Sequence, residues 1–176
     1  MVRFGIILML VCLTASLILS FTYKKTNPLI IIQKEKEEKE ALSTVYPEGE
    51  NFKKLDNHYL VYKDEKPIGF VIRVSAKGYA GPIEMLVGFN QEGTIQGVNV
   101  LEQKETPGLG ARISEVKYGE KEPWFLSQFK HKNIKELNLS KINAISGATI
   151  SSRAIIEGVR KNIEEFLKGQ TLNLKQ

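Results

Sequence analysis

An uncharged apolar run near the amino terminus constrains this chain more than any other feature. Every residue from Phe4 to Phe21 is uncharged, and a helix of that length can cross about 30 Å of hydrocarbon. Phe21 and Tyr23 are aromatic and are followed by two lysines, which is typical of the end of a membrane helix. A cleaved signal peptide is the alternative, but the run is longer than a signal-peptide core and the nearest cleavage triplet is poor. We therefore predict a retained transmembrane anchor over residues 1–26.

Charge and cysteine content narrow the possible partners. The formal net charge is +5, but lysine and glutamate are interleaved and form no basic stripe backed by aromatic residues, so we expect no nucleic-acid partner. Cys12 is the one cysteine and lies inside the apolar run. The folded part therefore has no disulfide and no cysteine-bound metal, and we predict no metal site. A simple count of the basic residues on either side of the run places the folded part in the cytoplasm.

The length of 176 residues leaves room for one ordinary domain and a short additional segment. Asn27-Pro28 is expected to end or kink the first helix. The charged stretch that follows predicts a connector over residues 27–50, helical to about Val45. The folded domain is then expected over residues 51–176.

Four segments alternate in hydrophobicity with the period of a β-strand. Phe70, Ile72 and Val74 share one face of their segment. Two of the three connections between the segments have the length and composition of hairpin turns. We therefore predict an antiparallel meander and an α+β fold, in which helices pack on a twisted sheet. The segments are residues 58–62, 68–76, 83–89 and 94–101.

Two connections are irregular. Gly78, Gly81 and Pro82 make a tight link between the second and third strands, which is either a simple turn or a place where backbone approaches another group closely. Two glycines and a proline between Glu105 and Gly110 exclude regular structure there, and shaped loops at strand ends often carry function.

The last part of the chain predicts two helical segments. Trp124, Phe125 and Phe129 are expected to face inward from a short helical turn. Ile155, Val159, Ile163 and Phe166 recur at helical spacing and predict an amphipathic helix. Ser151 or Ser152 is expected to cap its start and Gly169 to end it.

Small residues come directly before that final helix. Gly147 and Ala148 leave the first backbone N–H groups of the helix uncovered, and these groups together with the helix dipole attract an anion such as a phosphate. Thr149 adds a hydroxyl at this positive end. The alternative is an ordinary helix start with additional serines, and the residues alone do not separate the two.

The sequence "SGAT", residues 146–149, follows "ETPGLG", residues 105–110, behind a single amino-terminal anchor. In this order and spacing the two motifs resemble the FMN-binding family. That family includes the G subunit of the Rnf electron-transport complex and the C subunit of the sodium-pumping NADH:quinone reductase. The resemblance extends over nearly the whole chain.

The resemblance implies a covalent flavin. In the family, a flavin transferase moves FMN from FAD onto the last threonine of the motif, through a phosphoester bond. Carried over here, the acceptor is Thr149. The neighbouring site residues are Ser146, Gly147, Ala148 and Ile150. The family pattern begins with Asp, and here that position is Asn143.

The resemblance also places the "ETPGLG" loop against the flavin. Glu105 and Thr106 would supply polar contacts, Leu109 would cover an apolar ring face, and Gly110 would permit close approach of the backbone. Lys104 or Arg112 is the candidate for a cation near the ring.

The implied function is electron carriage by covalent FMN in an ion-translocating complex that links ferredoxin and NAD. The chain would have no catalytic residue of its own. Its partners would be the other membrane and peripheral subunits, the membrane and the flavin transferase, with the domain on the extracytoplasmic side. The alternatives are a free-standing anchored flavin carrier and an anchored interaction or sensor module without a cofactor.

Overall fold

The computed structural model describes residues 2–173, and side chains from residue 3 to residue 170. It consists of two compact units, one ending at Lys39 and one beginning at Glu40. Helix α1 (Val2–Val45) makes up the first unit and supplies the beginning of the second. Its apolar part has a mean hydropathy of 2.5 and is long enough to cross a membrane. The helix continues through Pro28. Of the two expectations for Asn27-Pro28, an end of the helix is therefore wrong, because one missing N–H does not stop this long helix, whereas a kink there stays a prediction.

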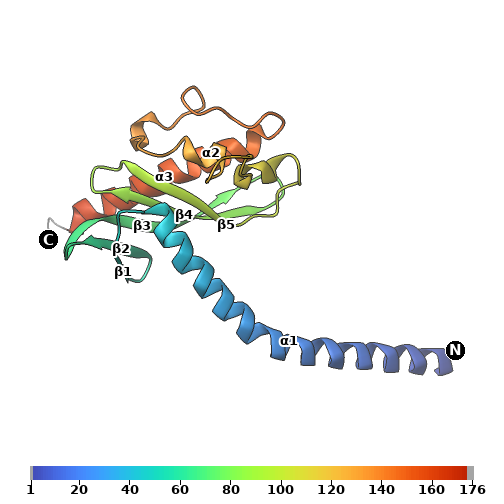
Figure 1. Ribbon diagram of the computed structural model, residues 1–176. Coiled ribbons are helices and arrows are strands. Elements are labelled where there is room, and N and C mark those ends of the chain that lie inside the picture. Colours follow the sequence, from blue (N-terminus) through green and yellow to red (C-terminus); the bar gives the residue numbers. More distant parts are fainter. Residues whose placement is uncertain (1, 174–176) are drawn as a thin grey trace. The chain divides into compact units, whose positions relative to one another are not determined.

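The second unit contains a five-stranded antiparallel sheet in the order β1-β2-β3-β4-β5 (Figure 1). The predicted meander and the α+β class are confirmed, because each strand pairs with its neighbour in the sequence. The strand β1 is not among the predicted segments, since its four residues carry no clear alternation. The strands are β1 (Asn51–Lys54), β2 (His58–Lys63), β3 (Lys66–Lys77), β4 (Pro82–Asn90) and β5 (Ile95–Glu102).

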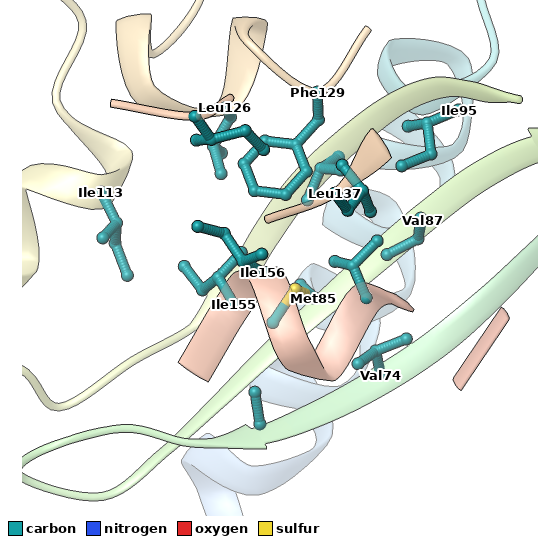
Figure 2. Close-up of a cluster of buried hydrophobic side chains, with 14 of the residues drawn as sticks. Val74, Met85, Val87, Ile95, Ile113, Leu126, Phe129, Leu137, Ile155 and Ile156 are labelled. Atoms are coloured by element: carbon teal, nitrogen blue, oxygen red, sulfur yellow. The ribbon is translucent and has the colours of Figure 1, made fainter. Parts of the chain in front are cut away.

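Helix α3 (Thr149–Asn173) covers one face of this sheet (Figure 1). Figure 2 shows Ile155 and Ile156 of α3 beside Met85 and Val74 in the main core. The predicted alternation in β3 and β4 is confirmed, because the inward residues belong to this core and to its margin. The predicted ends of α3 are wrong. The helix begins at Thr149, before both serines, and continues through Gly169.

The opposite face of the sheet carries the last turn of α1. The backbone of Val45 lies against Gly88 of β4 and Gly97 of β5, which are paired across the two strands. The Tyr46 hydroxyl donates to the carbonyl oxygen of Ile68 at 2.9 Å. A second, smaller core forms here from Ala41, Leu42, Val45, Tyr46, Val61, Val71 and Leu86.

Three short helical elements lie between β5 and α3: η1 (Gly110–Ser114), α2 (Trp124–Ser127) and η2 (Ile134–Glu136). The predicted helical turn at Trp124 is confirmed. Phe125 and Phe129 are fully buried, whereas Trp124 is half-buried at the edge of the core.

Candidate functional site

The start of α3 is shaped by a glycine. Gly147 has φ of +77°, a conformation that glycine adopts without strain, and it turns the chain into the helix. Thr149 is the first helical residue and its side chain is exposed. The first N–H groups of a helix have no partners within the helix. The hydroxyl of Thr149 therefore stands where the helix favours negative charge.

The four hydroxyls near this point divide into two kinds. Ser151 and Ser152 are buried. Ser152 accepts the N–H of Ile145 at 3.0 Å and donates to the carbonyl of Ala148 at 2.9 Å, so it holds the turn before the helix in place. Ser146 and Thr149 are exposed and remain accessible to a ligand or an enzyme.

The loop after β5 is anchored by a buried glutamate. Glu105 is 5% exposed. Its Oε1 accepts the backbone N–H of Ala80 at 2.9 Å, and its Oε2 accepts the hydroxyl of Ser151. The N–H of Glu105 donates to the side chain of Gln103 at 2.6 Å. The loop is therefore fixed both to the β3–β4 connection and to the first turn of α3.

A groove of about 470 Å³ lies between these segments, within the usual size range of ligand sites. Every residue predicted for the site lines it except Ser146, which is exposed beside it. The groove is lined by Tyr79, Glu105, Thr106, Leu109, Gly110, Gly147, Ala148, Thr149, Ile150 and Ser151.

Two lining residues are missed by sequence reasoning. Tyr79 lies in the irregular β3–β4 connection, next to Gly78. The close backbone approach considered for Gly78 is the sequence signal that could have placed Tyr79 in the groove. The sequence left open whether this connection is a simple turn or a close approach of the backbone to another group. A Cβ on Gly78 would collide with the Glu105 carboxylate, so the connection is a close approach. Ser151 is predicted only as a cap, and its bond to Glu105 has no signal in the sequence.

The rim of the groove is apolar and exposed. Tyr79 is 72% exposed, Ile150 57% and Leu109 46%. Apolar side chains of this size are normally buried or isolated, and here three of them line one groove together with the start of a helix. Such a site suits a ligand with a flat apolar ring and a phosphate group. The residues present therefore fit FMN.

The two candidate cations near the groove differ in their surroundings. Arg112, one of the two candidate cations, forms an ion pair with Glu115 at 2.9 Å between Nε and Oε2. Lys104 is exposed. Over the described part of the chain, no three His, Cys, Asp or Glu side chains are grouped to hold a metal ion.

The sequence matches that of known proteins over this region and beyond it. The FMN-binding domain family matches residues 78–164, which include the whole groove. The G subunit of the ion-translocating oxidoreductase complex of Haemophilus influenzae is 30% identical, and the match covers 97% of this chain and 92% of the relative. The G subunit of the proton-translocating ferredoxin:NAD(+) oxidoreductase complex of Clostridium ljungdahlii is 29% identical, with 90% and 87% covered.

A solved structure has a similar fold. Shewanella oneidensis NqrC matches with a TM-score of 0.50 and 22% identity, over 73% of each chain. At this identity the similarity concerns the fold of the domain.

Proposed function

Because the chain belongs to the family of FMN-binding G subunits of ion-translocating oxidoreductases, we propose that it is a membrane-anchored electron-carrier subunit of such a complex. FMN held in the groove would accept and pass on electrons. The protein itself would position the flavin and tie it to the membrane.

One observation carries this proposal: the groove brings the start of α3 and the loop after β5 together around an exposed threonine. Thr149 and Leu109 are far apart in the sequence, yet both line the same opening. A phosphate at the helix start and an apolar ring against Leu109 would satisfy both parts of the site.

We propose further that the flavin is attached covalently to Thr149. In that reaction the Thr149 oxygen bonds to the phosphorus on the FMN side of FAD, the diphosphate bond breaks, AMP leaves, and the hydroxyl proton is lost. A flavin transferase would bring the FAD. The exposure of Thr149 supports this step, because an enzyme must reach the hydroxyl from outside. The helix dipole would then favour the remaining negative charge by about 0.3–1 kcal/mol.

The other groove residues would orient the flavin. Leu109 and Ile150 present exposed apolar surface beside Thr149 and would cover part of the ring. Thr106 would offer its hydroxyl to the polar edge. Gly110 has no side chain to fill the groove and would let the backbone approach. Ser146, Gly147 and Ala148 complete the motif that the transferase would recognise.

The partners of the domain follow from the same family. The relatives are named as subunits of complexes, so other membrane and peripheral subunits would supply and remove the electrons. We propose that α1 holds the domain in the membrane on the extracytoplasmic side. This placement is opposite to the simple charge count, which rests on only a few residues around one helix.

The test is the mass of the protein from membranes of cells that make a flavin transferase. The wild type should carry one FMN minus one water, located on the peptide that contains Thr149. The Thr149→Ala variant should lack it, and Thr44→Ala, which removes another exposed threonine, should keep it. Unmodified wild-type protein would exclude the proposed covalent attachment of flavin to Thr149. Absence of any bound flavin would favour an interaction module instead.

A further inference from the structure

The carboxyl group of Glu105 joins three segments of the chain at one buried point. It accepts hydrogen bonds from Ala80 in the β3–β4 connection and from Ser151 in the first turn of α3, and it belongs to the loop after β5. Each of these segments contributes lining residues to the groove. Within the described residues, the hydrogen bonds recorded between the three segments all end on this group.

The backbone closes tightly around the carboxyl group. A Cβ on Gly78 would collide with Oε1, and a Cβ on Gly110 would collide with Oε2. Since both glycines lack side chains, two loops can surround a group that is costly to bury without partners. The two oxygens are occupied by protein donors, which leaves Glu105 poorly placed for the direct flavin contact that the resemblance implies.

The bond to Ser151 has a consequence for Thr149. Successive residues of an α-helix are about 100° apart around its axis, so residues two apart point to nearly opposite sides. Ser151 is 1% exposed and points inward, and Thr149 is exposed. Fixing Ser151 therefore fixes the rotation of the first turn and the side of the helix from which the Thr149 side chain projects.

We propose that Glu105 is a positioning residue for flavin attachment. By holding Ala80 and Ser151 together, it keeps the groove closed around the start of α3 and the Thr149 hydroxyl at its edge. The inference rests on the proposed function for the acceptor role of Thr149. It assigns Glu105 to the geometry of the acceptor, and not to contact with the flavin.

Two substitutions at Glu105 distinguish the effect of its hydrogen bonds on the groove from the effect of its negative charge. Glu105→Ala leaves the Ala80 N–H and the Ser151 hydroxyl unpaired. In Glu105→Gln, the amide oxygen can accept from Ala80 while the amide NH₂ donates to Ser151, because a hydroxyl both donates and accepts. The first readout is the initial rate of FMN addition to full-length protein in membranes that contain the transferase. It should fall about tenfold or more in Glu105→Ala and stay within about threefold of wild type in Glu105→Gln.

A matched control shows whether a loss of stability alone slows flavin attachment. Ile163 is fully buried in α3, away from the groove-lining residues. Ile163→Ala should lower the melting temperature but, at a temperature where the protein is folded, leave the rate of attachment within about threefold of wild type.

A second readout does not depend on flavin. Amide hydrogen exchange of the unmodified full-length protein reports on the Ala80 N–H and on residues 103–112 and 145–152. Glu105→Ala should speed exchange in all three segments together, by about tenfold at Ala80. Ile163→Ala should not produce this pattern.

The outcomes are distinct. Equal attachment rates and equal exchange in wild type and Glu105→Ala would overturn the inference. An equal loss of rate in Glu105→Gln and Glu105→Ala would also overturn it, because charge would then matter more than position. If wild type is never modified, the proposed attachment fails, and hydrogen exchange alone tests the role of Glu105. Faster exchange in the three segments of Glu105→Ala than in wild type would support Glu105 as the residue that orients this turn. Unchanged exchange would exclude that role.

Discussion

The α-carbon of Gly88 lies so close to the carbonyl oxygen of Val45 that a Cβ built on Gly88 would stand 2.5 Å from that oxygen. A Cβ on Gly97, the cross-strand partner of Gly88, would stand 2.8 Å from the same oxygen. The last turn of α1 thus lies directly on the backbone of β4 and β5. A methyl group at either glycine would have to push it away from the sheet.

Gly88→Ala should therefore lower the free energy of unfolding by about 1–3 kcal/mol, since a backbone oxygen cannot swing aside as a side chain can. Thermal and urea unfolding of the full chain in detergent measure the change. Gly169→Ala is the control, because within the described part of the chain no atom lies within 4 Å of a Cβ there. In a helix this change should be neutral or stabilising by up to about 1 kcal/mol. Equal effects of the two substitutions would contradict the close contact at Val45.

Asn143→Asp should change flavin attachment without changing stability. Asn143 is held through its backbone, whose N–H donates to Gln128 Oε1 at 2.9 Å and whose carbonyl accepts from Gln128 Nε2 at 3.2 Å; its side chain is exposed. The free energy of unfolding should change by less than about 0.5 kcal/mol. The attachment rate, followed by intact mass, should rise several-fold because the carboxylate restores the family pattern. Asn57→Asp, at an exposed position outside the groove, should leave the rate unchanged. An unchanged rate in Asn143→Asp would show that the transferase does not read this position.

Stability should decrease as the pH falls below about 6.5, the ordinary value for histidine. Burial lowers the pKa of His58, and the nearby Asp56 only partly opposes this. The ring of His58 packs edge-on against Phe166, with 4.9 Å between centroids. Because the unfolded chain takes up the proton more readily, the stabilisation is complete above the unfolded pKa and is lost as the pH falls through the folded pKa. Urea midpoints across this range should show the loss, and the dependence should be weaker in His58→Phe. An identical pH dependence in the variant would exclude His58 as its source.

Trp124→Phe should cost less stability than its size suggests. Among the described residues, the buried Nε1 of Trp124 has no hydrogen-bond partner, and the Lys117 Nζ lies 4.4 Å from the ring centroid. Phenylalanine removes the unpaired donor and keeps an aromatic face, so the expected loss is under about 1 kcal/mol. Phe125→Ala, in the adjacent buried position, should cost about 3–5 kcal/mol. Circular dichroism during chemical unfolding compares the two. A similar cost for both would mean that the indole N–H contributes a favourable contact.

The strands are predictable because alternation reports directly on which face is buried. Val74 and Met85 illustrate this: each lies at an inward position of its segment, and both are fully buried in the main core. The strand β1 has only one half-buried residue among its four, so it leaves no such pattern. The predicted start of α3 is too late because Ser151 and Ser152 have the composition of caps. Their hydroxyls instead bond to a distant loop and to the turn before the helix.

The sequence predicts most of the residues that line the groove but not the contacts between them. Motifs indicate the two loops, and the groove brings them together. The bond from Ser151 to Glu105 joins residues 46 positions apart, and local sequence carries no information about such a pair. Tyr79 belongs to the groove for the same reason, since only the folded sheet brings the β3–β4 connection to the loop after β5.

The order of the strands also determines when the groove can exist. In a meander, each strand finds its partner in the segment just synthesised, so the sheet can pair progressively as the chain emerges. The groove cannot form in this way, because one of its walls belongs to α3, which follows all five strands in the sequence. The Thr149 hydroxyl comes into position only when α3 docks on a finished sheet. A flavin-loading enzyme that acts on this groove would therefore meet only molecules in which both the sheet and α3 have folded.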